Sequence, residues 1–154
     1  MMNITYKQFE NFYAKTVAKL QKQWESEAIT YGFVADTEDE ILAYDKDYFY
    51  VAFDAETIVG YVIGETKTND QDNYMNVFPM NEKYLQVNDL YIAPAHRSKS
   101  IGSELLTIVE EKAKRNGIEH IFLSSATIDA EAVRMFYEKN GFKIWTTMFF
   151  KQSI

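Results

Sequence analysis

Residues 97–102 form the first candidate for chemistry, a short basic loop that reads Arg-Ser-Lys-Ser-Ile-Gly. The loop separates an apolar, strand-like run from an amphipathic, helix-like run. A helix N-terminus has unpaired N–H groups and a partial positive charge, so it attracts anions. Arg97 and Lys99 add two cations, and the two serines let the backbone approach a ligand closely. The loop therefore favours phosphate binding, although it matches neither G-x-x-x-x-G-K-[ST] nor G-x-G-x-x-G.

The second candidate is Asp89, a lone carboxylate in the apolar run Y-L-Q-V-N-D-L-Y-I. Strand alternation predicts Leu85, Val87, Asp89 and Tyr91 on one face of this strand. A buried carboxylate is costly unless it is paired. Asp89 could therefore lie in an ion pair or at an open strand edge, or it could anchor an amine or accept its proton. Proton removal matters because an ammonium group of pKa about 10 must be deprotonated before it attacks a thioester.

The spacing of the loop within its surroundings resembles the GCN5-related N-acetyltransferase (GNAT) family. The resemblance is carried by D-L-Y-I-A-P before the loop, R-x-x-S-x-G within it and F-Y-E-K-N-G-F farther on. In that family the backbone amides of the loop hold the pyrophosphate of acetyl coenzyme A. Arg97 and Gly102 match the family pattern, and Ser100 stands where the first glycine is usual. Serine keeps the N–H donor but tolerates positive φ poorly.

The resemblance also implies roles for individual residues. Tyr137 in F-Y-E-K-N-G-F would protonate the departing thiolate as a general acid; the alternative is that its ring only packs a helix face. The backbone N–H of Leu90 would polarise the thioester carbonyl. Ala130 stands where the family often has Asn, so Asp129 or Ser125 would supply that contact to the pantetheine arm. The implied cofactor contacts are Leu90, Tyr91, Ile92, Arg97, Ser98, Lys99, Ser100, Ile101, Gly102, Ser103 and Asp129.

The rest of the chain predicts the elements that must position these residues. Helices are expected over 5–27 with Thr5 as N-cap, over 37–44 with a Thr37–Glu40 capping box, over 102–115, and over 129–140 with Thr127 or Asp129 as N-cap. Strands are expected over 48–53, 57–65, 84–92, 118–125 and 142–151. The strand–helix–strand order across the loop implies parallel strands, with the loop at the carboxyl end of the first.

These elements predict an α/β fold in a single GNAT-like domain over residues 1–154. The sheet is expected to be mixed and mostly antiparallel, with a central parallel strand pair and helices on both sides. Residues 66–82 are polar and lack periodicity, yet they carry Tyr74, Met75, Val77, Phe78 and Met80. A loop this long in a compact domain is usually functional or disordered. Its apolar residues predict that it folds onto the acceptor cleft or a second subunit, and Trp24 or Tyr31 could also reach that cleft.

Composition narrows the classes of protein. The chain has 154 residues, a net charge of −7 and no cysteine. The charge disfavours nucleic acid as a partner, and the lack of Cys removes disulfides, thiolate metal sites and a Cys nucleophile. No apolar run approaches the roughly 20 residues that span a bilayer, and no signal-peptide pattern opens the chain. Two histidines without clustered carboxylates give no metal-site spacing. We expect a cytoplasmic protein with no metal, membrane or nucleic-acid partner.

Together these patterns predict an N-acetyltransferase that moves acetyl from acetyl coenzyme A to a primary amine by direct attack. A small cationic amine is expected because Asp89 and six acidic side chains within residues 36–47 would attract it. The alternatives are a protein N-terminal or lysine acetyltransferase, a coenzyme A-binding module without catalysis, and an interaction protein that dimerises through residues 66–82. A homodimer stays open for the enzyme as well.

Overall fold

The computed structural model describes residues 2–70 and 77–153. A five-stranded sheet runs in chain order, and every neighbouring pair of strands is antiparallel except the parallel pair β4 and β5. Its strands are β1 (Ile4–Gln8), β2 (Tyr48–Asp54), β3 (Thr57–Thr68), β4 (Lys83–Ile92) and β5 (Ile121–Leu123). The helices are α1 (Ala14–Glu27), α2 (Glu38–Leu42), α3 (Ile101–Arg115) and α4 (Ala130–Lys139), with 3₁₀ turns at Asn11–Tyr13 and Pro94–His96. The predicted mixed α/β fold is confirmed.

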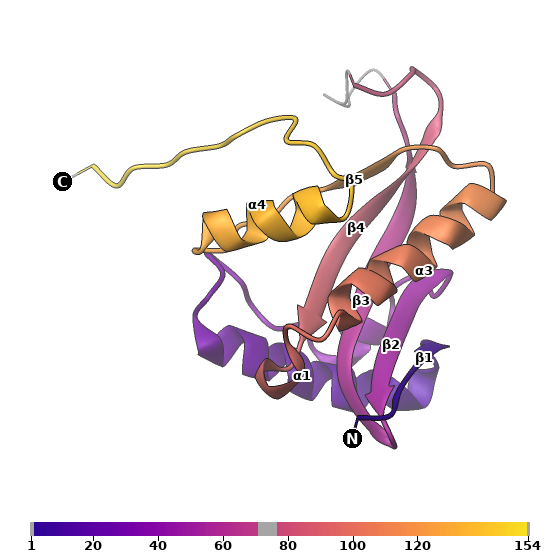
Figure 1. Ribbon diagram of the computed structural model, residues 1–154, viewed down its shortest axis with the longest axis vertical. Coiled ribbons are helices and arrows are strands. Elements are labelled where there is room, and N and C mark those ends of the chain that lie inside the picture. Colours follow the sequence, from indigo (N-terminus) through magenta and orange to yellow (C-terminus); the bar gives the residue numbers. More distant parts are fainter. Residues whose placement is uncertain (1, 71–76, 154) are drawn as a thin grey trace.

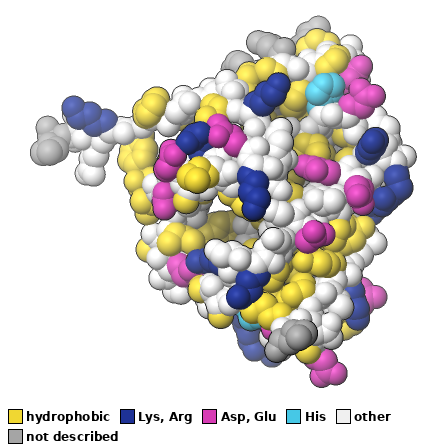
Figure 2. All heavy atoms as spheres, viewed as in Figure 1, with side chains coloured by type: hydrophobic (Ala, Val, Ile, Leu, Met, Phe, Trp, Pro, Cys, Tyr) yellow, Lys and Arg dark blue, Asp and Glu magenta, His cyan; other side chains and the backbone are white. Residues whose placement is uncertain are grey.

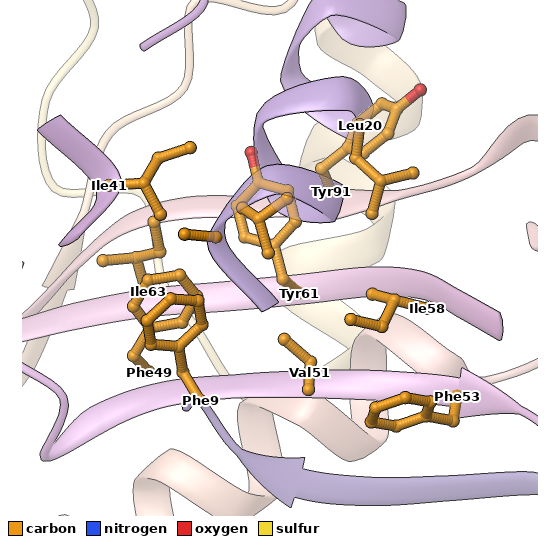
Figure 3. Packing of buried hydrophobic residues seen from close by; sticks show 12 residues of the cluster. Phe9, Leu20, Ile41, Phe49, Val51, Phe53, Ile58, Tyr61, Ile63 and Tyr91 are labelled. Carbon is orange, nitrogen blue, oxygen red and sulfur yellow. The ribbon is translucent and has the colours of Figure 1, made fainter. Parts of the chain in front are cut away.

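Helices cover both faces of the sheet, with α1 on one side and α3 and α4 on the other (Figure 1). Each side has its own apolar core. On the α1 side the rings of Phe9 and Phe49 stack with centroids 4.0 Å apart, and Tyr61 and Tyr91 rise from the sheet with their hydroxyls pointing away from it (Figure 3). On the α3 side Leu105, Leu106, Val109 and Ala113 are buried against strand residues. This double burial makes the sheet a rigid support for the loop that follows β4.

A β-bulge in β4 corrects the predicted faces of that strand. Ile63 of β3 pairs with Asp89 and Gly64 pairs with Val87, so Asn88 is the extra residue. Leu85 and Val87 therefore face the α3 side, whereas Asp89 and Tyr91 face the α1 side. The prediction that all four share one face is wrong because a strictly two-residue period does not survive a bulge. The consequence is functional: the bulge turns Asp89 toward α1.

The N-terminal prediction is also wrong in part. Residues 4–8 form the edge strand β1, which pairs with β2, so Thr5 caps no helix, and α1 begins only at Ala14. Partly buried Ile4 and Tyr6 alternate with exposed neighbours, which is the two-residue period of a strand. The helical spacing of apolar residues begins at Phe9, and the prediction extended it wrongly back to Thr5. The Thr37–Glu40 capping box, by contrast, is present and opens the short helix α2.

The C-terminal prediction is wrong as well. From Phe142 to Ser153 the described chain forms no strand and extends away from the body (Figure 1). β5 is limited to three residues instead of spanning 118–125, because β4 and β5 diverge after Val87. A segment of β-rich sequence forms no strand unless a neighbour supplies ladder hydrogen bonds.

The long connection between β3 and β4 is partly described. Phe78 lies against the ring of Tyr84 at 5.2 Å and against His120 at 4.9 Å, and Asn69 donates to the carbonyl of Phe78 at 2.9 Å. This part of the connection folds onto the end of the sheet. The predicted contacts of Tyr74 and Met75 lie outside the described residues. No helix within residues 2–70 and 77–153 is both long and apolar enough to span a bilayer.

Candidate active site

A cleft opens where the parallel strands separate. β4 and β5 pair only from Leu85 to Val87, and β4 then continues alone to Ile92. The N–H of Leu85 donates to the carbonyl of His120 at 2.9 Å, so Leu85 faces β5. The N–H of Ala93 donates to the carbonyl of Val59 on β3 at 2.8 Å. Backbone groups alternate in direction along a strand, so those of Leu90 and Ile92 point the other way, toward the gap left where β5 ends. The gap belongs to a cleft of about 1250 Å³ that reaches from α1 to α4 and the loop 97–100.

The loop before α3 presents a row of free backbone donors to this cleft. The six N–H groups from Ser98 to Ser103 have no hydrogen-bond acceptor within the described part of the chain. Ser98 and Ser100 have left-handed backbone angles, with φ of 60° and 65°. Left-handed residues in a turn draw successive N–H groups into a concave nest that binds anions. The N–H groups of Ile101, Gly102 and Ser103 add the positive end of the α3 dipole. This cradle fits a pyrophosphate.

Ser100 adopts the backbone conformation that glycine would favour. A non-glycine residue in the left-handed region costs about 1 kcal/mol. We expect Ser100→Gly to raise the free energy of unfolding by roughly 0.5–1 kcal/mol, measured by urea titration, because it removes this strain and keeps the N–H donor. Ser103→Gly is the matched control: Ser103 lies in the first turn of α3, where glycine lowers stability by about 0.5–1 kcal/mol. Equal or lower stability of Ser100→Gly would show that the loop is unstrained.

The side chain of Arg97, a predicted phosphate contact, lines the cleft and binds two neighbouring elements. Its guanidinium forms two 2.8 Å hydrogen bonds with Glu27 at the end of α1, and its Nε donates to the carbonyl of Ile92 at 2.9 Å. The hydrogen bonds to Glu27 raise the pKa of Arg97 further. Its guanidinium also lies over the ring of Tyr91, 5.5 Å from the centroid. Arg97 therefore fastens the loop to α1 and β4, and the exposed Lys99 is the loop's remaining cation.

Glu27 was not singled out from the sequence. It lies 70 residues from Arg97, and nothing in the local pattern of α1 pairs the two residues. Its carboxylate also accepts a 2.6 Å hydrogen bond from the hydroxyl of Tyr91. Tyr91 was predicted as a cofactor contact, yet its backbone faces β3 and its side chain faces α1. The Arg97–Glu27–Tyr91 group thus couples the anion cradle to the opposite wall of the cleft.

Asp89 lies at the α1 end of the gap in a buried polar network. Nε2 of the fully buried Gln21 is 3.3 Å from Asp89 and 3.2 Å from Asp36, and the hydroxyl of Tyr61 is 3.5 Å from Asp89. The hydroxyl of Tyr44 donates to Asp36 at 2.8 Å. Neither carboxylate has an ion-pair partner among the described residues. The ion pair that was one alternative for Asp89 is therefore not formed, and Asp89, which lines the cleft, has a second carboxylate, Asp36, behind it on Gln21.

The surroundings of Asp89 raise its pKa toward neutral pH. Burial raises the pKa of Asp89 to about 6, the charge of Asp36 adds to the rise, and the Tyr61 hydrogen bond opposes it. A carboxylate with this pKa is ionised at neutral pH but holds a proton more readily than a surface Asp. It can therefore accept a proton from an ammonium group or bind that group as a counter-ion. Gln21 and Tyr61 are the partners that sequence reasoning missed.

Aromatic side chains form the wall beside Asp89. The indole of Trp24 stacks on Phe33 with centroids 3.9 Å apart and on Tyr91 at 5.2 Å. Its Nε1 donates to Thr30 at 2.9 Å. Trp24 and Phe33 line the cleft, whereas Tyr31 points outward and contacts Phe150. The expectation that Trp24 reaches the cleft is confirmed, and Phe33 joins it. Such faces attract cations.

Tyr137 lies on α4 at the other side of the cleft. Burial raises the pKa of its hydroxyl to about 12, so the group is protonated at neutral pH. Its ring contacts Phe136 at 5.0 Å and Phe142 at 5.6 Å. Phe136 also approaches the backbone of Gly102, where a Cβ would lie 3.3 Å from the ring. The absence of a side chain at Gly102 therefore lets α4 close onto the start of α3.

Asp129, a predicted cofactor contact, is the N-cap of α4. Its Oδ1 accepts a hydrogen bond from the N–H of Ala132 at 3.1 Å, which confirms one of the two predicted caps. Asp129 also lines the cleft, as do Leu90, Ile92, Ser98, Ser100 and Gly102. No group of three or more His, Cys, Asp or Glu residues suited to a metal ion occurs among residues 2–70 and 77–153.

Figure 2, in the same view as Figure 1, shows a hollow beside α4. Comparison with known proteins agrees with the geometry of the site. The family model "Acetyltransferase (GNAT) family" matches residues 3–142. Among solved structures, aminoglycoside N-acetyltransferase AAC(6')-Iy in complex with CoA superposes with a TM-score of 0.73 at 13% identity, covering 99% of this chain and 96% of that one. The aminoglycoside acetyltransferase meta-AAC0020 from an uncultured soil metagenomic sample, in complex with sisomicin, gives 0.68 at 15% identity and coverage of 98% and 97%.

Ard1 from Thermoplasma volcanium gives a TM-score of 0.69 at 18% identity, covering 93% of this chain and 84% of that one. The probable N-acetyltransferase HLS1 of Arabidopsis thaliana is 28% identical over 99 residues, which are 58% of this chain and 25% of that protein. The chain thus spans about a quarter of the length of that curated relative. The fold and the cleft resemble those of acyl-coenzyme A-dependent N-acetyltransferases. The chain belongs to the GNAT family.

Proposed function

We propose that this protein transfers acetyl from acetyl coenzyme A to a primary amine of a small cationic molecule by direct attack. The observation that carries the proposal is the partly buried carboxylate of Asp89, which lines the cleft with Trp24 and Phe33 and is linked through Gln21 to a second carboxylate, Asp36. A cleft end with a carboxylate that has no ion pair among the described residues, and with a π face beside it, suits a ligand with an ammonium group. The fold shared with aminoglycoside acetyltransferases supports an acceptor of this class.

Each part of the cleft has a task in this reaction. The thioester supplies an activated acetyl group. The six N–H groups from Ser98 to Ser103 bind its pyrophosphate, and the N–H of Leu90 lies on the side of β4 where it can polarise the acetyl carbonyl. Asp89 orients the amine and takes its proton. Tyr137 donates a hydrogen bond to the departing sulfur, whose charge grows as the C–S bond breaks.

Calorimetric titration with acetyl coenzyme A, followed by thiol release against amines, tests the proposal. The panel holds a polyamine, an aminoglycoside and a peptide with a free N-terminus and a lysine. We expect micromolar cofactor binding and release with a small polycation. Release with the peptide alone would instead identify a protein acetyltransferase. Binding without release would support a module without catalysis, and no binding at about 1 mM cofactor would refute the cradle.

A further inference from the structure

Gln21 is a polar side chain that is buried where the rest of its helix face is apolar. It shows no exposed surface, and the other buried residues of α1 are Ala14, Val17 and Leu20. A buried amide is costly unless it is hydrogen-bonded, and an apolar side chain of similar size would fill the same space without that cost. The position therefore calls for a role in which the amide itself is used.

The amide of Gln21 has one orientation that satisfies its neighbours. Its Oε1 accepts from the backbone N–H of Asp36 at 2.6 Å, and its Nε2 lies 3.2 Å from Oδ2 of Asp36 and 3.3 Å from Oδ2 of Asp89. Only an acceptor can face an N–H group, and only a donor can face two carboxylates. Each N–H of the amide is therefore committed to one carboxylate, and Gln21 joins α1 to β4 and to the segment before α2.

These contacts make the two carboxylate oxygens of Asp89 unequal. Within residues 2–70 and 77–153, both donors that reach the side chain of Asp89, Nε2 of Gln21 and the hydroxyl of Tyr61, lie at Oδ2. Oδ1 accepts no hydrogen bond from this part of the chain, and it is not one of the fully buried polar atoms that lack a partner. Oδ1 therefore keeps access to solvent. Since Asp89 lines the cleft, Oδ1 is the oxygen that a ligand can reach.

We propose that Gln21 is a positioning residue, which holds Oδ2 of Asp89 so that Oδ1 faces the incoming amine and takes its proton. The inference rests on the proposed function, in which Asp89 is the base. In this step an N–H bond of the ammonium group breaks, an O–H bond forms at Oδ1, and the nitrogen keeps the electron pair that attacks the thioester carbonyl. A donor fixed on Oδ2 also favours the ionised carboxylate, which is the form that can accept the proton.

Gln21 acts against the groups that favour the protonated form of Asp89. Burial and the charge of Asp36, from the segment before α2, both raise the pKa of Asp89, and the Tyr61 hydroxyl on β3 opposes them from 3.5 Å. Tyr44, just after α2, binds Asp36 and not Asp89. Loss of the Gln21 donor should therefore raise the pKa of Asp89 further, whereas loss of a side chain that only fills space should not.

Gln21→Met tests the proposal, because methionine keeps the length of the side chain and removes both donors. With the best amine, kcat should fall about 10–100-fold, as expected for the loss of a hydrogen bond to a charged group. The midpoint of the acidic limb of kcat/KM should move from about pH 6 toward about pH 7, while the affinity for acetyl coenzyme A stays unchanged. Gln23→Met is the matched control, since it makes the same chemical change at an exposed position of α1 and should alter none of these values.

A carboxyl titration separates this inference from the proposed function. ¹³C NMR follows the side-chain carboxyl of Asp89, assigned by its loss in Asp89→Asn, without any turnover. We expect a higher pKa of Asp89 in Gln21→Met than in the wild type, and a higher one still in Gln21→Glu, which keeps the shape of the side chain and adds a negative charge. An unchanged pKa in both variants, or wild-type kcat in Gln21→Met, would overturn the role of Gln21. A wild type that acetylates no amine, with the pKa of Asp89 still raised in Gln21→Met, would refute the proposed function while upholding the control of Asp89 by Gln21.

Discussion

Asp89→Asn is expected to lower kcat/KM for acetyl transfer to an amine by about 10²–10⁴-fold, the usual contribution of a positioned acid or base. Asn keeps the shape of Asp89 and can still accept from Gln21 and Tyr61. It can neither take a proton from the incoming ammonium nor balance its charge. Steady-state kinetics with the best amine measures the loss, and cofactor affinity should stay unchanged because the cradle lies at the other end of the cleft.

The pH profile shows whether Asp89 itself titrates. Its pKa is about 6, so kcat/KM of the wild type should fall as the pH drops through about 6, where the carboxylate is protonated. Asp36→Asn removes the neighbouring negative charge, which contributes to the raised pKa of Asp89. The acidic limb of the profile should therefore move to lower pH in this variant. A limb that stays in place would assign the titration to another group.

Asp89→Asn, which is expected to lower activity, should raise the free energy of unfolding. The folded-state pKa of Asp89 is raised above its unfolded value, so the folded state binds more protons between about pH 4 and 6 and the free energy of unfolding falls as the pH rises through that window. Asn at position 89 does not titrate, so Asp89→Asn removes this fall in the free energy of unfolding. We expect the variant to exceed the wild type by about 1–3 kcal/mol at pH 7 and to approach it near pH 4, measured by urea titration. A variant less stable than the wild type at pH 7 would show that the hydrogen bonds of Gln21 and Tyr61 stabilise the ionised Asp89 by more than its burial costs.

Local signals predicted the parts of the fold that depend on near neighbours. The loop before α3, the Thr37–Glu40 capping box and the Asp129 cap each involve residues a few positions apart, and each is present. Asp89 was found because a carboxylate in an apolar run is costly to bury. These features can be read from a single sequence since their energetics are local.

The features that were missed depend on distant segments. The bulge at Asn88 arises from pairing with β3, and it decides which way Asp89 points. Gln21 binds Asp89 across 68 residues of sequence, and Glu27 binds the guanidinium of Arg97 across 70. The predictions for residues 4–8 and 142–151 failed for the same reason: a short β-rich segment becomes a strand only where it pairs with another segment of the chain, and of these two only residues 4–8 do so in the structure. The periodicity of such a segment does not indicate which other part of the chain it pairs with.

Tyr137→Phe is expected to lower kcat by about 10²–10³-fold while leaving cofactor affinity unchanged, as removal of one donor to a developing charge does. The phenol, with a pKa of about 12, is a weaker acid than a thiol of about 8.5. Complete proton transfer from Tyr137 to the departing sulfur is therefore uphill, and we expect Tyr137 to act chiefly through a hydrogen bond to that sulfur. That bond strengthens as the thiolate forms, so its loss appears in kcat and not in binding.

The design of this test separates the hydroxyl from the ring. Phe keeps the ring contacts with Phe136 and Phe142, so the α4 packing survives the substitution. Tyr6→Phe is the matched control, because it removes a tyrosine hydroxyl on β1, outside the cleft, and should leave kcat unchanged. Single-turnover measurements place the loss in the chemical step. If Tyr137→Phe turns over like the wild type, the hydroxyl serves only the packing of α4, and the leaving sulfur must be stabilised by water or by backbone donors such as those of β4.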